Sequence, residues 1–291
     1  MITPTQWKDY ELLDSGDGMK LERWGAVILA RPDPQVLWPR AKDEKFWERA
    51  QAVYTRTTSG KGTWTLMQEL PERWKISYGK LSFWTRPTDF KHTGLFPEQA
   101  VNWDWMTGKI QEARIKKQES PKILNLFAYT GGATLACLAA GAEVTHVDAS
   151  EGIIAWAKEN AELSGLADRP VRWIVDDVMK FVAREERRGQ QYDAIIMDPP
   201  SYGRGKKNEL WKIEEMLWPL MQKCALLLSN APLFFTVNSY TTGMSSTVIE
   251  NMLKALLADR SGSFSTGEVG LKPKGDGWTL PAGIFARWEA K

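Results

Sequence analysis

The chain has 291 residues, 43% of them hydrophobic and 25% charged, which is typical of a globular protein with one large or two smaller domains. It has no apolar stretch of membrane-spanning length, no secretory signal pattern and only two cysteines, so we expect a cytoplasmic protein without a disulfide framework or a metal site. The net charge of +2 neither requires nor excludes a nucleic acid partner.

Residues 1–90 do not alternate helix with strand. Short β-like runs are separated by turn-rich pieces such as Asp14–Gly18, and only Lys42–Arg49 has a weak helical pattern. We therefore predict a small N-terminal β-rich domain over residues 1–90, followed by a second domain over residues 91–291. The predicted strands are Tyr10–Leu13, Ala26–Ala30, Ala52–Thr57, Thr63–Leu66, Trp74–Ser77 and Leu81–Thr85.

A helix is predicted from Pro97 to Lys117, since Pro97 suits the first turn and Glu98 complements the positive helix start. From Ile123 onward, strands and helices alternate five times, and two β runs close the chain. This order predicts an α/β fold with a mostly parallel, doubly wound sheet and an antiparallel C-terminal hairpin. The predicted strands are Ile123–Phe127, Val144–Val147, Val171–Val175, Ala194–Met197, Leu233–Val237, Ser263–Leu271 and Trp278–Trp288; the helices between them are Ala133–Ala140, Glu151–Leu163, Val178–Arg187, Glu209–Leu228 and Val248–Leu257.

The first strand–turn–helix unit contains the glycine pair Gly131-Gly132. Glycine lets the backbone turn tightly and approach a ligand closely, because no Cβ is in the way. In sheets of this kind the ligand lies at the carboxyl ends of the strands, over the helix N-termini. The sequence therefore predicts a ligand site at the turn Phe127-Ala128-Tyr129-Thr130-Gly131-Gly132.

Acidic residues end the next two strands. Asp148 follows the second strand, where a carboxylate binds ribose hydroxyls, and Asp177 or Asp176 follows the third, where it can accept from an adenine amino group. Each aspartate also precedes a helix, so helix capping is the alternative interpretation. A nicotinamide dinucleotide site is disfavoured, because the Gly-x-Gly-x-x-Gly pattern that binds pyrophosphate is missing. A nucleoside cofactor without phosphates fits better.

The loop Asp198-Pro199-Pro200-Ser201-Tyr202 follows the fourth strand. Two prolines fix φ and remove two N–H donors, so their carbonyl groups are expected to be free to accept from a planar substrate. Tyr202 could cover the face of a base. The alternative is a proline-rich turn without chemistry. Arg204, Lys206 and Lys207 follow and either bind phosphates or are ordinary solvated charges.

Together these segments resemble class I S-adenosylmethionine-dependent methyltransferases with a Rossmann-like sheet. More narrowly, they resemble the large-subunit ribosomal RNA methyltransferases that modify cytosine C5 or guanine N7. The segment 92–99 matches the family's entry into the catalytic domain, and the resemblance covers about residues 80–240. The resemblance implies that Phe127, Ala128, Tyr129, Thr130, Gly131 and Gly132 contact the methionine part of the cofactor, that Asp148 binds the ribose, and that Asp177 and Val178 contact the adenine. It also implies that the segment with Phe96 and Gln99 lies over the cofactor and that Asp198 and Pro199 face the methyl group and the target. We add Ala149, Ser150 and Asp176 as candidate cofactor-binding residues, and Pro200 and Tyr202 as candidate catalytic residues.

The sequence departs from the family pattern at three places, two of which bear on the target. Ala100 stands where the family usually carries arginine, so the resemblance does not carry over the cofactor contact of that arginine. Cytosine C5 chemistry needs a thiolate just after the fifth strand, but the sequence there is Val237-Asn238-Ser239-Tyr240 and contains no cysteine. Ser201 separates the second proline from the aromatic residue, unlike the pattern of amino-group methyltransferases. A nitrogen target is therefore favoured over cytosine C5.

Four functions remain open from the sequence. The first is methylation of a ribosomal RNA base at nitrogen, and the second is methylation of a protein or a small molecule. The third is an RNA-binding assembly factor without turnover, and the fourth a nicotinamide-dependent oxidoreductase. The sequence names neither the nucleotide nor the oligomeric state. The expectation that residues 1–90 help to bind substrate rests only on analogy with other appended domains. His146 lies inside a predicted strand, and we expect it to have a structural role.

Overall fold

The computed structural model describes residues 1–56, 62–117, 119–204 and 210–291. The chain forms two compact units: unit 1 consists of Met1–Ala100 and Gly270–Ala282, and unit 2 of Val101–Val269 and Gly283–Lys291. The first segment of unit 1 thus extends to Ala100, beyond the predicted domain boundary at residue 90. Unit 1 also includes the connection between the last two strands, which was not predicted.

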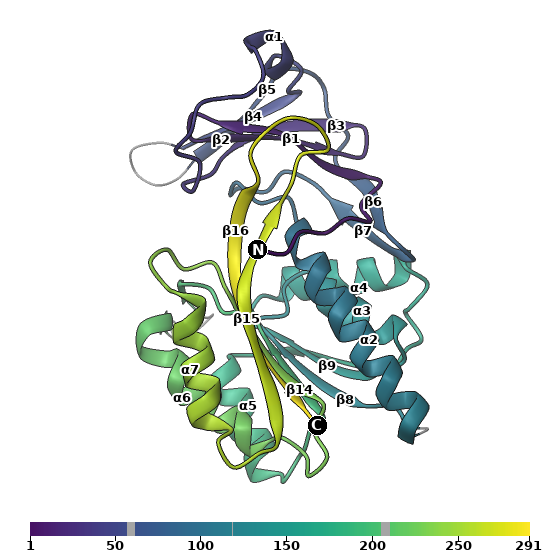
Figure 1. The fold of residues 1–291 in the computed structure, drawn as a ribbon. Coiled ribbons are helices and arrows are strands. Elements are labelled where there is room, and N and C mark those ends of the chain that lie inside the picture. Colours follow the sequence, from purple (N-terminus) through teal and green to yellow (C-terminus); the bar gives the residue numbers. More distant parts are fainter. Residues whose placement is uncertain (57–61, 118, 205–209) are drawn as a thin grey trace. The chain divides into compact units, whose positions relative to one another are not determined.

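Unit 1 contains a five-stranded sheet in the order β1-β2-β3-β4-β5 and a separate β6–β7 hairpin (Figure 1). Neighbouring strands of the sheet are antiparallel except β3 and β4, which are parallel. One strand, β2, was not predicted. The elements are β1 (Tyr10–Gly16), β2 (Met19–Trp24), β3 (Val27–Pro32), α1 (Glu44–Trp47), β4 (Ala52–Arg56), β5 (Gly62–Leu66), β6 (Trp74–Tyr78), β7 (Leu81–Thr85) and η1 (Pro97–Gln99).

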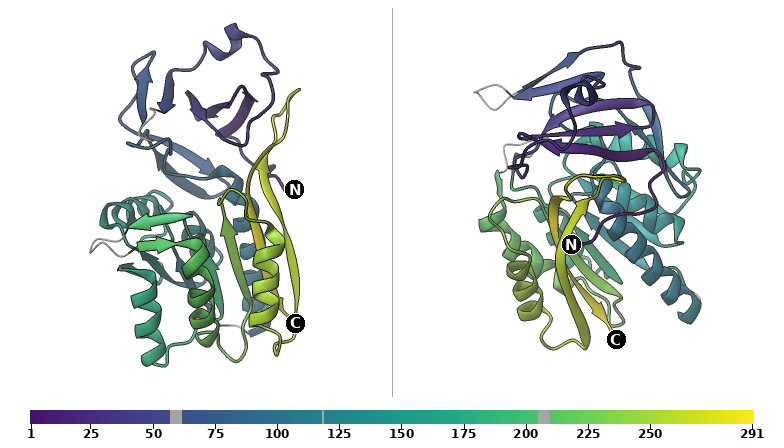
Figure 2. Two further views of the ribbon diagram at one scale, coloured as in Figure 1. Left: turned by 90° about the vertical axis from the view of Figure 1, so that its left-hand side faces the viewer. Right: turned by 45° about the horizontal axis from the view of Figure 1, so that its top comes forward.

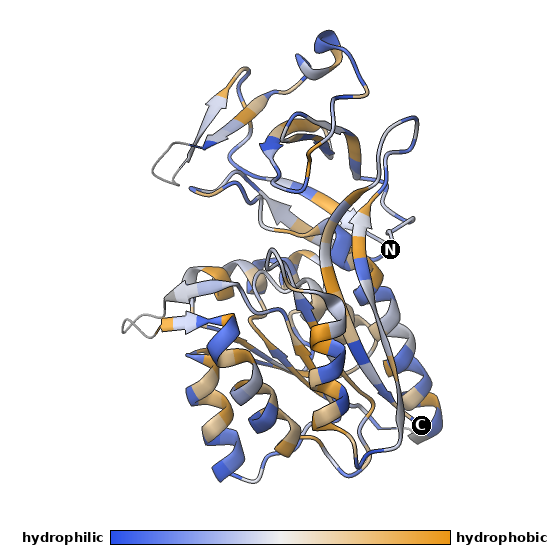
Figure 3. Cartoon of the chain, turned by 60° about the vertical axis from the view of Figure 1, so that its left-hand side comes forward, coloured by the Kyte–Doolittle hydropathy of each residue, from blue (hydrophilic) through white to orange (hydrophobic). Residues whose placement is uncertain are grey.

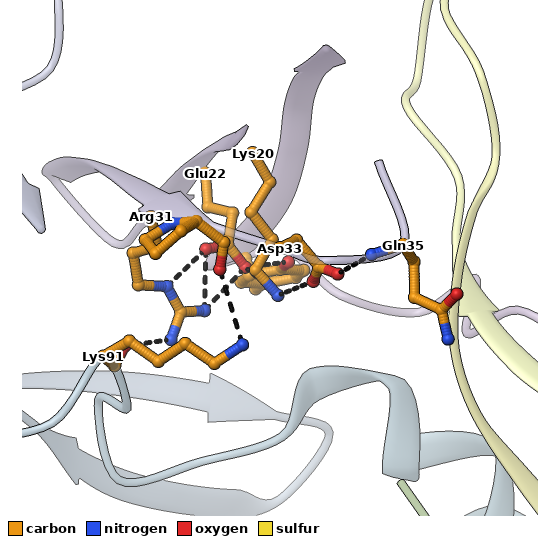
Figure 4. Close-up of polar contacts among 8 residues, drawn as sticks. Lys20, Glu22, Arg31, Asp33, Gln35 and Lys91 are labelled. Carbon is orange, nitrogen blue, oxygen red and sulfur yellow. Dashed lines mark hydrogen bonds and ion pairs between the residues drawn. The ribbon is translucent and has the colours of Figure 1, made fainter. Parts of the chain in front are cut away.

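A buried ionic network joins β2 to β3 (Figure 4). Arg31 Nε and Nη2 donate to the two oxygens of the fully buried Glu22 at 2.7 and 2.8 Å, and Tyr10 Oη donates to the same carboxylate at 2.7 Å. Lys20 Nζ lies 3.2 Å from Asp33 Oδ2. Burial alone would raise the pKa of Glu22, but Arg31 and Lys20 outweigh it and hold that pKa below its usual value. The pairing therefore keeps the buried carboxylate ionised.

Unit 2 contains a seven-stranded sheet in the order β10-β9-β8-β11-β14-β16-β15. The five strands from β10 to β14 are parallel, whereas β16 runs antiparallel to β14. This arrangement confirms the predicted α/β fold with an antiparallel C-terminal hairpin. The strands are β8 (Lys122–Leu126), β9 (Glu143–Asp148), β10 (Val171–Val175), β11 (Ala194–Met197), β14 (Phe234–Ser239), β15 (Gly262–Leu271) and β16 (Leu280–Ala290).

Helices cover both faces of this sheet. Figures 1 and 2 show α2, α3 and α4 on one face and α5, α6 and α7 on the other. Alternate residues of the central strands, among them Leu126, Met197 and Val237, pack into a buried core with α5–α7. Figure 3 shows the apolar central strands of this unit and the mixed faces of its helices. The helices are α2 (Ala100–Lys117), α3 (Gly132–Ala139), α4 (Glu151–Leu163), α5 (Val178–Arg187), α6 (Ile213–Leu226) and α7 (Ser246–Leu256).

The predicted helix Glu209–Leu228 is wrong at its start. α6 begins at Ile213, and the residues before it form β13 (Leu210–Lys212), which pairs antiparallel with β12 (Tyr202–Arg204). The strand forms because Trp211 is fixed by tertiary contacts: its ring lies 4.8 Å from the ring of Phe127, and its indole N–H donates to Pro200. Such contacts leave no periodic signal in the local sequence.

Candidate active site

The candidate site residues of unit 2 lie at the carboxyl ends of adjacent parallel strands. In the sheet register, Val175 pairs with Asp148, Leu126 pairs with Val147, and Met197 pairs with Leu126. The loops that follow β8, β9, β10 and β11 therefore emerge side by side at one edge of the sheet. This is the edge where open α/β sheets bind their ligands.

The loop after β8 has an unusual backbone. Phe127 and Tyr129 have φ values of 54° and 49°, and Gly131 has φ of 92°. Positive φ is costly for residues other than glycine and persists where surrounding structure imposes it, as in ligand-binding loops. At Gly132 a Cβ would lie 2.5 Å from the indole ring of Trp103. Both glycines of the predicted turn are thus required, one by its conformation and the other by close packing.

Polar side chains that the sequence analysis missed form hydrogen bonds with this loop and between the elements beside it. Asn160 Nδ2 donates to the Thr130 carbonyl at 2.9 Å. Asn125 Nδ2 donates to Thr134 Oγ1 at 2.9 Å, and Thr134 Oγ1 lies 2.9 Å from His146 Nδ1. Burial lowers the pKa of His146 to about 3, so the ring is neutral at physiological pH. His146 therefore has the structural role that its position within a strand predicted.

Asp148 is joined to the glycine loop. Its Oδ2 accepts from the Tyr129 N–H at 3.0 Å, and its Oδ1 accepts from the Ser150 N–H at 3.0 Å. Burial raises the pKa of Asp148, while the N–H groups of Ser150, Tyr129 and Ala149 oppose that shift. A carboxylate oxygen can accept a second hydrogen bond, so the held carboxylate can still bind the hydroxyl groups of a ribose.

Helix capping occupies part of the acidic pair after β10. Asp177 Oδ1 accepts from the Lys180 N–H at 3.0 Å and caps α5, and Asp176 pairs with Arg184. Val178 is buried in the first turn of α5. In the same way Ser150 caps α4, accepting from the Ile153 N–H. The alternative interpretation of these residues as caps is thus correct for Asp177, and its predicted contact with adenine stays a prediction, as does that of Asp176.

The Asp198–Tyr202 loop follows β11. The Pro200 carbonyl accepts from Trp211 Nε1 at 2.6 Å, and the Ser201 carbonyl accepts from the Ile213 N–H at 3.1 Å. Contrary to expectation, the Pro200 carbonyl is therefore not free, because one of its two lone pairs accepts from the indole N–H of Trp211. Tyr202 keeps 55% of its surface exposed, which leaves its ring available to a substrate.

Five further predicted residues cannot be placed at this edge of the sheet. Phe96 and Gln99 belong to unit 1, where Phe96 precedes η1 and Gln99 ends it as a buried residue. Their contact with the cofactor stays a prediction. Lys206 and Lys207 lie outside the described residues, and the side chain of Arg204 is likewise not described.

The residues of the edge fit a nucleoside cofactor. The glycine loop presents closely approachable backbone, Asp148 presents a held carboxylate, and both lie on neighbouring strands. Within the described part of the chain, no helix is long and apolar enough to span a membrane, and no group of His, Cys, Asp or Glu side chains is arranged to hold a metal ion.

Three features together are typical of S-adenosylmethionine-dependent methyltransferases. They are a seven-stranded sheet with this strand order, a glycine loop after its first strand in the chain, and an acidic residue after its second. The model of the S-adenosylmethionine-dependent methyltransferase family matches residues 50–252, and the chain belongs to this family. Its cofactor is therefore S-adenosylmethionine.

Solved structures agree with this assignment. The S-adenosylmethionine-dependent methyltransferase from Agrobacterium tumefaciens shares 38% sequence identity with a TM-score of 0.94, over 100% of this chain and 93% of that chain. A methyltransferase named SMU.776, solved with S-adenosylhomocysteine, shares 18% identity with a TM-score of 0.74, over 98% of this chain and 76% of that chain. The second likeness shows the fold alone.

Curated relatives carry ribosomal RNA names. The chain is 31% identical over 206 residues to "Ribosomal RNA large subunit methyltransferase K/L" of Pseudoalteromonas atlantica, which is 70% of this chain and 26% of that protein. It is 34% identical over 115 residues to "Ribosomal RNA large subunit methyltransferase I" of Aeromonas hydrophila, which is 39% of this chain and 27% of that protein. The chain thus spans about a quarter of the length of these relatives.

Proposed function

We propose that this chain is a cytoplasmic enzyme that transfers the methyl group of S-adenosylmethionine to a base nitrogen of ribosomal RNA. The curated relatives with ribosomal RNA names support the substrate class. When bound, the cofactor supplies an electrophilic sulfonium methyl group. The protein holds the cofactor and the nucleophile close together and in line, which is most of what methyl transfer requires.

The observation that carries the choice of nitrogen is the absence of a usable thiol. Cytosine C5 becomes nucleophilic only after a thiolate has attacked the ring. Both cysteines of the chain are fully buried, Cys137 in α3 and Cys224 in α6. Burial raises the pKa of Cys137 to about 12 and also raises that of Cys224 well above its usual value. Neither forms a thiolate near neutral pH, whereas a base nitrogen needs none.

The Asp198–Tyr202 loop supplies the groups for this reaction. Asp198 follows β11 next to the glycine loop strand β8, and in this proposal its carboxylate accepts the N–H proton of the target base as the nitrogen is methylated. Tyr202, more than half exposed, covers the face of the base. Trp211 fixes the loop through the Pro200 carbonyl.

A loop of unit 1 has the properties of a contact for single-stranded RNA. Phe90 is 69% exposed, and the neighbouring Lys91 lies among other cations. Burial and the nearby charge of Lys20 lower the pKa of Lys91 to about 8. The loop is held by Thr88, whose hydroxyl donates to the carbonyl of His92 at 2.8 Å. An exposed aromatic ring beside cations suits base stacking and phosphate binding.

The decisive experiment compares ribosomal RNA from cells with and without the gene by mass spectrometry of modified nucleosides. The purified chain is then tested for transfer of a labelled methyl group to RNA from the cells that lack it. One missing N-methylated nucleoside, restored by the purified chain, is the expected result. Transfer to protein or to small molecules alone would support the second function. Specific RNA binding without transfer would support an assembly factor.

A further inference from the structure

An arginine is buried in unit 2 without an acidic partner. Arg287 of β16 is only 6% exposed, and its guanidinium lies 4.4 Å from the ring centre of Trp105 and 4.2 Å from that of Phe285. Among the residues that the structure describes, its recorded side-chain partner is the amide of Asn102, and no carboxylate contributes to its pKa. Burial lowers the pKa of Arg287 to about 10, so it remains charged at neutral pH. A buried cation without an acidic partner is costly, which raises the question of what its donors hold in place.

The donors of Arg287 fix the orientation of two amide side chains. Arg287 Nη2 donates to Asn102 Oδ1, and Asn102 Nδ2 donates to Asn238 Oδ1 at 2.9 Å. A guanidinium only donates, so the oxygen of Asn102 must face it and the amino group of Asn102 must face Asn238. The oxygen of Asn238 is thereby occupied. Its amino group, Nδ2, is consequently held as a hydrogen-bond donor that points away from Asn102.

Asn238 lies beside Asp198 in the sheet. β11 and β14 are parallel, with Ile196 opposite Thr236 and Met197 opposite Val237. Asn238 is the next residue of β14, and Asp198 comes directly after the end of β11. Because side chains alternate along strands, Asn238 lies on the face of the sheet opposite the core with α5–α7, and continuing the alternation past Met197 puts Asp198 on the same face. The hydrogen bond from Asn102 of α2 to Asn238 agrees with this placement.

We propose that Asn238 Nδ2 donates a hydrogen bond to an acceptor atom of the target base, next to the nitrogen that is methylated. This inference rests on the function proposed above. Asp198 accepts from the N–H group of the base while Asn238 donates to the adjacent carbonyl oxygen or ring nitrogen, so the pair complements a base edge that carries both groups. Asn102 and Arg287 are positioning residues, since they act through Asn238.

The test uses two changes in the full chain, a truncation and an isosteric replacement. Asn238→Ala removes the donor. Asn102→Asp keeps the size of the side chain but removes its amino group, so the Asn238 amide turns and presents its oxygen instead. Because Asn102→Asp also gives Arg287 an acidic partner, it is expected to leave the melting temperature unchanged or raise it. A purely structural role predicts the opposite, a loss of stability together with any loss of activity.

The measurements are methyl transfer to RNA, calorimetric affinity for S-adenosylmethionine and melting temperature, with the exposed Asn230→Ala as the matched control. Both variants are expected to lower kcat/KM for RNA about 10- to 100-fold, with unchanged cofactor affinity, because a base acceptor loses its donor. Asn230→Ala is expected to behave as the unaltered chain. Arg287→Lys, which keeps the charge and can still donate to Asn102, is expected to lose less activity than Arg287→Met.

Two results would overturn the inference while leaving the proposed function intact. One is transfer by Asn238→Ala and Asn102→Asp at the rate of the unaltered chain. The other is an equal loss of cofactor affinity and transfer, which would make Asn238 a cofactor contact. If the unaltered chain itself transfers no methyl group to RNA, the proposed function fails, and the inference about the target base fails with it.

Discussion

The N–H group of Tyr129 donates to Asp148 Oδ2 at 3.0 Å, which joins the glycine loop after β8 to the carboxylate at the end of β9. Tyr129 has φ of 49°, a conformation that this hydrogen bond helps to hold. The shape of the loop and the position of the carboxylate therefore depend on each other. A change at Asp148 is expected to disturb both.

Asp148→Asn is expected to weaken S-adenosylmethionine binding about 10- to 100-fold, measured by titration calorimetry. The amide has one oxygen, so it cannot accept from both the Tyr129 and the Ser150 N–H groups as the carboxylate does. Glu162→Gln on the exposed side of α4 serves as the control and should bind normally. Cofactor affinity equal to that of the unaltered chain would show that Asp148 does not bind the ribose.

The affinity of the unaltered chain should also depend on pH. Burial raises the pKa of Asp148, so its carboxylate takes up a proton at a higher pH than an exposed aspartate does. If the ionised form binds the ribose, affinity is retained above that raised pKa and lost as the pH falls through it. Calorimetry across mildly acidic pH would measure this loss. A flat affinity across that range would speak against a charged contact.

Gly132→Ala is expected to destabilise the chain by about 1–3 kcal/mol, because the new Cβ would lie 2.5 Å from the Trp103 ring, which must move. Gly108→Ala is the matched control. Gly108 lies within α2 with nothing within 4 Å of an added Cβ, and alanine there should stabilise by about 0.5–1 kcal/mol. Urea unfolding of both variants measures the difference. Equal stabilities of the two would mean that Trp103 does not pack closely on Gly132.

Much of the fold was readable from local sequence. The strands Val171–Val175 and Ala194–Met197 have the predicted bounds, because short apolar runs end there at aspartates. The strand β2 was missed because Glu22 occupies one of its buried positions. Glu22 can be buried because it pairs with Arg31 on the next strand. This ion pair leaves no alternation of apolar residues in β2 from which the strand could be predicted.

The site was predictable only in part for the same reason. Its loops follow strand ends and are visible as short segments, but the side chains that hold them come from distant positions. Asn160 supports Thr130 from 30 residues away, Asn102 and Asn238 are 136 residues apart, and Arg287 lies 185 residues from Asn102. Likewise, only the fold shows that Trp211 occupies the Pro200 carbonyl.

Trp211→Phe is expected to lower methyl transfer about tenfold without changing the affinity for S-adenosylmethionine. Phenylalanine can keep the contact with the Phe127 ring but cannot donate to the Pro200 carbonyl, so the Asp198–Tyr202 loop loses one anchor. Trp218→Phe, at a partly exposed position of α6, is the control. Unchanged transfer by Trp211→Phe would mean that the indole hydrogen bond does not position the loop.

The Glu22–Arg31 pair should make the stability of the chain sensitive to acid. The folded-state pKa of Glu22 lies below its unfolded value of about 4.3, so its contribution to stability is fully present above that value and is lost as the pH falls through the folded pKa.

Glu22→Gln at pH 7 leaves Arg31 buried without its acidic partner and is expected to lower the free energy of unfolding by about 3–5 kcal/mol. The double variant Glu22→Met and Arg31→Met removes both charges and should recover most of this loss. Thermal unfolding between about pH 2 and pH 7 measures both effects, because the loss is expected only below the unfolded pKa of about 4.3. A double variant as unstable as Glu22→Gln would show that shape and hydrogen bonding, rather than charge pairing, hold β2 against β3.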